Sequence, residues 1–592
     1  MRSSYRLARQ VFARHHAGAR AIVVCALALT AASCARQTTP AVDRSALTIS
    51  VVGTSDLHGG VLSEEGRGGL ALLDGYVRNL RAARQADGGG VLLLDAGDLF
   101  QGTLESNLNE GQVVVAAYNA LGYAAAAVGN HEFDYGPIGE AATPATPQDD
   151  PRGALKARAA EARFPFLAAN IIDQSTGKPV DWPNVRPSAI VEVAGVRVGI
   201  VGLTTSRTLS ATMAANTAGL AIAPLAPTLA AEAVKLRASG ATIVVAAVHA
   251  GGRCTRFDNP SDLSSCGADE EIFQVARALP GRLVDGIVAG HRHFGIAHDV
   301  AGIPIISSYS RGVAFGRIDL AVDASTGRVT GHRLFPPQDL CSALDPAART
   351  CASTATAAAV PAAYEGRPIG TSPDIDRLLA PAVDRARRVK DQPLNGNIAD
   401  ALTRLTNGES ALGNLFADWS RAAASADVAI ANSGGLRADL PAGPLTFGRL
   451  YAVTPFDNRE MTLRLTGGEL RRIVAANLQE RGSFMLLSGI RATAECRSGR
   501  LRVTLRRDSG GTVSDTDTLR VATSDFLVEG GDGFFTPVLP LRDLKDEGRL
   551  VRDGIAAWLE RHGTTWRAAD LLTDGNRRVT YSGARPVRCI TP

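Results

Sequence analysis

Carboxylate, imidazole and amide side chains recur in this sequence directly after short apolar runs. The turn that follows residues 124–128 contains Asn130, His131 and Asp134. Asn130 offers a neutral oxygen, and Asp134 lies where its carboxylate can hold the His131 imidazole in one tautomer. Taken alone, this turn could equally be a loop with a capping Asn and a solvated His, because short motifs have a high false-positive rate.

Four further loops carry the same residue types, so that five loops together supply seven N and O donors. These donors are Asp56, His58, Asp98, Asn130, His249, His291 and His293. A single ion with an open catalytic position needs fewer ligands. Seven donors suit two ions that share a bridging carboxylate, an arrangement that activates water and clamps a phosphoryl group. A lone Asp-x-His or His-x-His is more often structural, and it is the repetition that predicts a metal centre.

Alternating strands and helices are the elements that must position these loops. The apolar or β-branched runs 47–53, 91–94, 124–128, 243–248 and 284–289 predict strands, and each ends just before a donor. Helical periodicity over 69–84, 112–121 and 227–238 separates them. Function sits at the ends of strands in α/β sheets. We therefore predict an α/β domain whose sheets are covered by helices.

Length and charge bound the remaining possibilities. A chain of 592 residues is too long for one core, and contents of 45% hydrophobic and 21% charged residues describe an ordinary globular protein. The net charge of +4 comes from the first 34 residues, which hold five arginines and no acid; without these arginines 58 basic residues face 59 acidic ones. Nothing in this balance predicts a nucleic-acid polymer as partner.

Residues 1–34 have the composition of a secretory signal. The arginines precede an apolar run, 21–32, that is too short to span a bilayer. The residues 31–34 resemble a bacterial lipobox, with Ala31 in place of the usual Leu. This predicts an exported protein, periplasmic or at the cell surface, that a lipid on Cys34 anchors to the membrane through the tether 35–46. Ordinary cleavage just after Ala35, giving a soluble exported protein, is the alternative.

Cysteine usage agrees with export, because an even number of cysteines remains outside the leader. Six cysteines allow 15 connectivities. Proximity favours the pairs Cys254–Cys266 and Cys341–Cys351, which leaves Cys496 with Cys589.

The donor loops resemble those of the calcineurin-like metallophosphoesterases and, more closely, the 5′-nucleotidase/UDP-sugar hydrolase family. The resemblance implies that Asp56, His58 and His293 hold one divalent ion (Zn, Mn or Co). Asn130, His249 and His291 would hold the second, and Asp98 would bridge the two. His131 and Asp134 would form the catalytic dyad beside the phosphate. Ser55 stands where the family usually has Asn.

The resemblance continues into the last 200 residues, where it implies a nucleotide site. A strand over 428–431 ends in a loop that contains Asn432, Gly434, Gly435 and Arg437. Glycines let the backbone approach a ligand, and Arg can fork onto phosphate or ribose oxygens, although a glycine turn with a solvated Arg has the same pattern. Two further motifs match the family, and they are Pro455-Phe456-Asp457-Asn458 and Gly530-Gly531-Asp532-Gly533-Phe534. In relatives the phenylalanines of these motifs sandwich the base, which implies the same role for Phe456 and Phe534. Relatives often carry a further Arg shortly before the helix that contains Gly413-Asn414-Leu415. This Arg has no clear equivalent here, although Arg404 lies nearby.

These observations predict an enzyme with two α/β domains. Residues 47–336 would form a four-layer α/β-β/α metallophosphoesterase domain, 337–390 a linker with a connecting helix, and 391–592 a smaller 5′-nucleotidase C-terminal domain. We expect hydrolysis of nucleoside 5′-monophosphates. A 2′,3′-cyclic-nucleotide phosphodiesterase/3′-nucleotidase or a UDP-sugar hydrolase would share the metal residues. A surface lipoprotein that binds nucleotides without turnover is an alternative of a different class.

Overall fold

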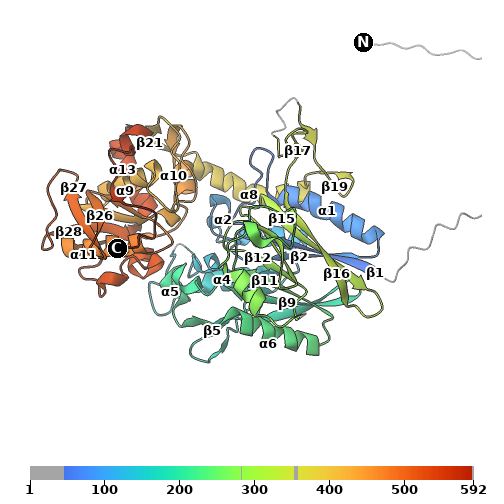
Figure 1. Cartoon of the computed structure of the whole chain (residues 1–592). Coiled ribbons are helices and arrows are strands. Elements are labelled where there is room, and N and C mark those ends of the chain that lie inside the picture. The colour runs from blue at the N-terminus through green and yellow to red at the C-terminus, as the bar shows by residue number, and fades with distance from the viewer. Residues whose placement is uncertain (1–45, 140, 282, 353–357, 590–592) are drawn as a thin grey trace, which may run out of the picture. The chain divides into compact units, whose positions relative to one another are not determined.

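The computed structural model describes residues 46–139, 141–281, 283–352 and 358–589. The predicted signal segment, Cys34 and the tether up to residue 45 lie outside these residues. Arg44–Pro592 form one compact unit of mixed α/β structure (Figure 1). Among the described residues, no helix combines the length and the apolar character needed to cross a membrane.

Two sheets form the centre of the N-terminal domain. The first has the order β16-β15-β1-β2-β3-β4-β7 and the second the order β13-β14-β12-β11-β9-β8. The strands of the first sheet are β1 Ala46–Thr54, β2 Gly90–Asp95, β3 Ala125–Ala127, β4 Phe166–Leu167, β7 Val185–Arg186, β15 Ala314–Asp323 and β16 Val329–Asp339. Those of the second are β8 Ser188–Val193, β9 Val196–Thr204, β11 Ile243–His249, β12 Gly286–Ala289, β13 Gly295–Val300 and β14 Ile303–Ser308.

The predicted four-layer arrangement is confirmed by the way the apolar side chains divide. One core lies between the two sheets, where Val51 and Leu92 of the first sheet share a cluster with Val245 of the second. Helices α1 (Leu70–Ala86), α3 (Gln112–Leu121) and α4 (Gly153–Glu161) cover the outer face of the first sheet. Helices α6 (Leu225–Ala238) and α7 (Glu271–Ala278) cover the second. Strands buried on both faces explain the continuous apolar runs in the sequence.

Helix α8 (Pro373–Lys390) connects the two domains (Figure 1). Proline at its first position, Asp374 and Asp376 in its first turn and Arg387, Arg388 and Lys390 in its last turn all favour the helix, since these charges oppose its dipole. The helix occupies the last part of the segment 337–390, for which a linker with a connecting helix was predicted.

The C-terminal domain is built on a five-stranded sheet of order β25-β22-β28-β24-β29. Its strands are β22 Val428–Asn432, β24 Arg459–Thr466, β25 Met485–Ser488, β28 Thr518–Ser524 and β29 Lys545–Leu550, and its main helices are α9 Ala411–Ala423, α11 Gly467–Gln479 and α13 Val551–His562. A separate three-stranded sheet joins β27 (Arg500–Arg507), β26 (Ile490–Arg497) and β31 (Val579–Tyr581). A second small sheet joins β23 (Gly443–Thr446), β21 (Pro393–Ile398) and β30 (Thr565–Trp566).

The last strand of the first sheet extends beyond the predicted end of the N-terminal domain. Strand β16 runs through Pro336 and Pro337 to Asp339, past the predicted domain end at 336. Proline is tolerated there because β16 is the edge strand of its sheet. The domain boundaries themselves stay predictions.

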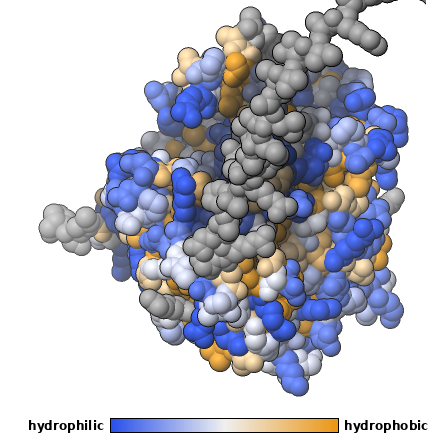
Figure 2. Space-filling view, turned by 90° about the vertical axis from the view of Figure 1, so that its right-hand side faces the viewer, coloured by the Kyte–Doolittle hydropathy of each residue, from blue (hydrophilic) through white to orange (hydrophobic). Residues whose placement is uncertain are grey.

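The two disulfides that proximity favoured, Cys254–Cys266 and Cys341–Cys351, are present, and so is the remaining pair, Cys496–Cys589. Each of the first two closes a short loop, and the third ties β26 to the C-terminal segment. The face of the molecule in Figure 2 carries hydrophilic residues mixed with smaller hydrophobic groups.

Candidate active site

The seven predicted donors come together because the strands that deliver them end on one side of the two sheets. Strands β1, β2 and β3 are parallel neighbours, and Asp56, Asp98 and Asn130 follow their ends. Strands β11 and β12 are parallel neighbours in the second sheet, and His249 and His291 lie at or just after their ends. The carboxyl ends of parallel strands meet at one edge, which explains the convergence.

One group of donors consists of Asp56, His58 and His293. Their ligating atoms lie within 4.8 Å of one another. The Nε2 atoms of His58 and His293 are 3.0 Å apart, and His293 Nε2 lies 3.4 Å from Asp56 Oδ1. Asp56 and His58 are buried, whereas His293 remains partly exposed.

The second group consists of Asn130, His249 and His291. Asn130 Oδ1 lies 3.1 Å from His249 Nε2 and 3.1 Å from His291 Nδ1. The amide nitrogen of Asn130 donates to the carbonyl of Ala211 at 3.0 Å, which turns the amide oxygen toward the two imidazoles.

Asp98 lies between the two groups. Its Oδ2 is 3.0 Å from His249 Nε2 in the second group and 3.9 Å from His58 Nε2 in the first. Burial opposes ionisation of Asp98, yet His249 and His131 hold its pKa well below the usual range. The geometry therefore allows one carboxylate to serve both groups.

The donor set fits divalent cations. The Nδ1 atoms of His58 and His249 face the carbonyls of Gln101 at 2.9 Å and Ala96 at 2.8 Å, so each Nδ1 carries a proton and each Nε2 faces the cluster. Burial opposes the charge of His249, but Asp98 raises its pKa to about 10, so a metal ion would displace the proton on its Nε2. Burial, reinforced by neighbouring cations, lowers the pKa of His58 well below 6.5 and that of His291 to about 3. Neutral imidazoles and ionised carboxylates are the forms that bind metal.

Backbone strain concentrates in the donor loops. Asp56, His58, Asp98, His291 and His293 all have positive φ, between 48° and 75°. Non-glycine residues occupy this region rarely and at a cost in free energy, and they cluster at functional sites. Five of the seven donors share this conformation, which aims their side chains into one small volume.

Glu132 is a buried residue that the sequence analysis did not single out. Its carboxylate accepts three backbone N–H groups, from Asp98 at 2.8 Å, Leu99 at 2.7 Å and Gly129 at 2.7 Å. It therefore ties the loop of Asp98 to the loop of Asn130. The available signal was an acid inside the turn that also carries Asn130, His131 and Asp134.

The side chains of His131 and Asp134, the predicted dyad, are in contact, with 2.6 Å between His131 Nδ1 and Asp134 Oδ2. Burial would lower the pKa of His131, but Asp134 and Asp98 raise it overall. Thr212 donates from its hydroxyl to Asp134 Oδ1 at 2.7 Å, so both carboxylate oxygens are held. Thr212 lies 78 residues from Asp134 in the sequence, and no local pattern could have found it.

A cavity of about 190 Å³ lies over this cluster and is lined by both domains. The N-terminal domain contributes Asp98, Asn130, His131 and both histidines of the last loop. The C-terminal domain contributes five of the six predicted substrate residues, namely Asn432, Gly434, Gly435, Arg437 and Phe456. The loops that sequence reasoning took from separate domains therefore face one space.

Arg437 and Phe456 lie nearest to the donor cluster. Arg437 Nη2 is 3.2 Å from His58 Nε2, and its guanidinium lies 5.7 Å from the centre of the Phe456 ring. The Phe456 ring also stacks beside His131, with 5.6 Å between ring centres. Burial lowers the pKa of Arg437 to about 10, and Arg311 and Arg404 add to this effect. Arg437 keeps its charge, and it would meet an anion there.

The prediction that Phe534 lines the nucleotide site is wrong. Phe534 is 4% exposed and belongs to the core of the C-terminal domain, as does its neighbour Phe535. The turn Gly530–Gly533, with Asp532 at φ 52°, turns both rings inward, where they anchor the loop. The aromatic residue that lines the cavity from this region is Phe526, eight positions earlier. The sequence motif could not distinguish a ring that anchors a loop from one that meets a ligand.

Close packing disfavours a side chain at the two glycines of the 432–437 loop. A Cβ atom added at Gly434 would lie 2.6 Å from Ser483 Oγ, and one added at Gly435 would lie 3.0 Å from Asn432 Oδ1. Asn432 Nδ2 in turn donates to Asp532 Oδ2 at 2.7 Å. This wall of the cavity is thus polar and tightly fitted.

Several contacts between the domains were not predicted. Gln101 Nε2 donates to the carbonyl of Pro455 at 2.9 Å, and Arg311 Nη2 donates to the carbonyl of Arg437 at 2.7 Å. At the end of α8, Lys390 Nζ contacts the buried Glu105 carboxylate at 2.6 and 2.8 Å. These bonds hold Arg437 and the Phe456 loop against the donor cluster.

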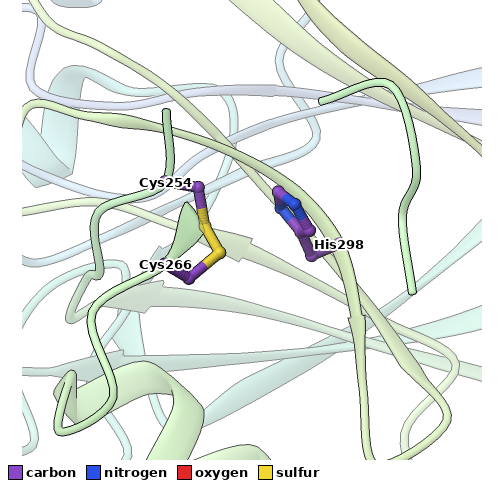
Figure 3. Close-up of side chains that lie close together, drawn as sticks. All are labelled: Cys254, Cys266 and His298. Atoms are coloured by element: carbon purple, nitrogen blue, oxygen red, sulfur yellow. A yellow bond between two sulfur atoms is a disulfide. The ribbon is translucent and has the colours of Figure 1, made fainter. Parts of the chain in front are cut away.

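A third set of potential ligand atoms comes from Cys254, Cys266 and His298 (Figure 3). None of these residues lines the cavity. The two sulfurs form a disulfide and are not available as thiolates. His298 is fully buried, and its Nε2 has no hydrogen-bond partner among the described residues. This group is a structural bridge packed beside an imidazole.

The chain is similar to several known proteins over most of its length. The family model of the 5′-nucleotidase C-terminal domain matches residues 391–539. Protein UshA of Yersinia enterocolitica is 25% identical over 541 residues, which cover 87% of this chain and 91% of that protein. The 5′-nucleotidase of Vibrio cholerae is 25% identical, with 82% of this chain and 85% of that protein covered. The fold is similar to that of the 5′-nucleotidase precursor of Thermus thermophilus, with a TM-score of 0.68, 24% identity and coverage of 90% of this chain and 99% of that one.

Proposed function

Since the chain belongs to the 5′-nucleotidase family and is a hydrolase of nucleotide phosphoesters, we propose that it is an exported 5′-nucleotidase that uses two divalent metal ions. It would convert nucleoside 5′-monophosphates to nucleoside and phosphate. Zinc, manganese or cobalt suits the mixed imidazole and carboxylate donors.

One observation carries this proposal. Two donor groups with Asp98 between them open into a cavity whose opposite wall carries a guanidinium, Arg437, and an aromatic ring, Phe456. The donor groups match a phosphate, and the guanidinium adds a positive charge beside it. The aromatic and glycine-lined wall suits the flat base and the sugar, which a phosphatase without base selectivity would not need.

When bound, two metal ions would supply Lewis-acid chemistry and a water of lowered pKa. The protein groups supply the rest. Arg437 would balance the charge of the phosphoryl oxygens. His131, oriented by Asp134, would donate a hydrogen bond or a proton to the departing oxygen of the nucleoside. Phe456 and Phe526 would hold the base.

Export and anchoring are further parts of the proposal. Three disulfides within the described residues support an oxidising compartment. The Arg-rich leader and the lipobox-like residues before Cys34 lead us to propose a lipid anchor in the periplasm or at the cell surface. Mass spectrometry of the mature protein from its native host tests this. An acylated N-terminal Cys34 is expected, and an unmodified mature chain that starts after residue 35 would contradict it.

The enzymatic proposal is tested by phosphate release from a panel of substrates. The panel contains 5′-, 3′- and 2′,3′-cyclic nucleotides, UDP-glucose and p-nitrophenyl phosphate, each with Mn, Zn or Co. We expect the highest kcat/KM on 5′-monophosphates. A preference for 3′- or cyclic nucleotides, or for UDP-glucose, would assign the related activity instead. Equal rates on p-nitrophenyl phosphate would remove the nucleotide role of the C-terminal domain.

A further inference from the structure

One face of the small sheet β27-β26-β31 is unusually basic. Strands β26 and β27 pair in the register Arg491↔Arg506, Thr493↔Thr504, Glu495↔Arg502 and Arg497↔Arg500. Directly paired residues point to the same side of a sheet, and alternation sends Ala492, Val503 and Leu505 to the buried side. The solvent side therefore carries five guanidiniums and one carboxylate. We call the set Arg491, Arg497, Arg500, Arg502 and Arg506 the arginine face.

Most of this charge is not neutralised locally. Arg497 pairs with Glu495 at 2.8 Å, and Arg491 lies 3.4 Å from Asp508. Arg506 donates to the carbonyl of Gly510, and within the described residues Arg500 and Arg502 form no ion pair. Outside its leader the sequence is nearly neutral, so this face is a local concentration of positive charge.

The register makes the arrangement unfavourable for the hairpin itself. Arg491 stands opposite Arg506, and Arg497 stands opposite Arg500. Like charges placed directly opposite one another destabilise a β-ladder. A hairpin selected only for stability would avoid both pairs, which indicates that the charges serve contact with an anionic partner.

The shape and the residue types of the face restrict that partner. The arginines lie on a sheet, with cross-strand neighbours about 5 Å apart and same-strand neighbours about 7 Å apart. Between them stand Thr493 and Thr504, whose hydroxyls can also bind phosphate oxygens. The solvent side of β26 and β27 holds only Arg, Thr and Glu, so it has no aromatic platform for stacking bases. Phosphates arrayed in a plane are what an anionic bilayer presents.

We propose that the arginine face binds the headgroups of an anionic phospholipid membrane. No residue of β26 or β27 lines the catalytic cavity, so this contact is separate from substrate binding. It would add to any N-terminal anchor and would fix which side of the C-terminal domain faces the bilayer. The interaction is electrostatic and should weaken as ionic strength rises.

The test compares full-length proteins that carry the same leader. The triple variant Arg500→Gln/Arg502→Gln/Arg506→Gln removes three charges from the face. The control Arg385→Gln/Arg387→Gln/Arg388→Gln removes three exposed charges from α8. Sedimentation with vesicles of phosphatidylcholine, with or without 30% phosphatidylglycerol, measures partitioning at about 50 and 200 mM salt.

We expect the face variant to partition at least roughly tenfold less onto the anionic vesicles, and the control to behave like the unmodified protein. Its nucleotidase activity should be unchanged and its melting temperature equal or higher, since two like-charge pairs are relieved. Equal partitioning of all three proteins, or equal loss in both variants, would overturn the proposal. Tighter binding to a 20-mer oligonucleotide than to the vesicles, lost in the face variant only, would assign the face to nucleic acid and overturn it as well.

Discussion

The positions of the donor loops in the N-terminal domain were predicted from the sequence more accurately than those of the predicted substrate residues in the C-terminal domain. All seven donors that were predicted from strand ends converge in the structure. In the C-terminal domain Arg437 and Phe456 line the cavity, but Phe534 lies in the core and Phe526 takes the place expected for it. Both regions belong to α/β domains with helix-covered sheets, so we attribute the difference to the residue types.

This difference shows that the type of a residue and the direction of its side chain are separate pieces of information about a site. Histidine and aspartate at successive strand ends are rarely needed for packing, so their type alone indicates a site. Phenylalanine is equally at home in a core and against a base, and only the path of its loop decides between them. The predictions below test each side of this contrast.

The largest effect is expected at Asp98, which lies between the two donor groups. Asp98→Ala should lose both metals and nearly all activity, whereas His58→Ala should mainly weaken one site. Elemental analysis after desalting measures the occupancy, with His332→Gln as a control outside the cluster. Near-full occupancy of both sites in Asp98→Ala would refute the bridging role.

His131 tests whether a residue inside the donor cluster can be separated from the donors. His131→Ala should keep both metals and lower kcat by about a hundredfold or more, the usual scale for a positioned acid–base group. Metal content and turnover are measured on the same sample. Loss of metal together with activity would make His131 a metal ligand instead of a separate catalytic residue.

The phenylalanines test the C-terminal side directly. Phe456→Ala and Phe526→Ala should each raise KM for a nucleoside monophosphate about tenfold, because stacking contributes about 1–3 kcal/mol per base. Turnover of p-nitrophenyl phosphate should hardly change. Phe534→Ala should instead lower the free energy of unfolding by about 3–5 kcal/mol. A Phe534→Ala protein of normal melting temperature and raised KM would reverse the assignment.

The smallest effect is expected at Thr212, which supports the dyad from a distant loop. Thr212→Val should lower kcat by roughly threefold to tenfold, since it removes one hydrogen bond to a charged carboxylate. KM and metal content should stay the same, and Thr212→Ser should restore most of kcat. If serine failed to restore activity, the contact would be one of packing.

Much of the fold could be predicted, and the reason is periodicity. The strands before the five donor loops and helix α3 were predicted within about two residues, because buried parallel strands leave unbroken apolar runs. The contacts that fix side-chain direction could not be predicted. Glu132 acts through three backbone N–H groups, and Thr212 and Arg311 act across long sequence separations. Such contacts depend on how loops fold against each other, which no local pattern encodes.

The positive φ angles of the donor loops set stability against activity in protein engineering. At Asp56, His58, Asp98, His291 and His293, glycine would relax the backbone while it removed the ligand. Without metal, a glycine variant at these positions should therefore melt at a higher temperature than the corresponding alanine variant. A library screened for heat resistance alone would therefore first accumulate inactive variants with substitutions at these five positions. Thermostabilisation of this enzyme has to include a screen for catalysis in the same round.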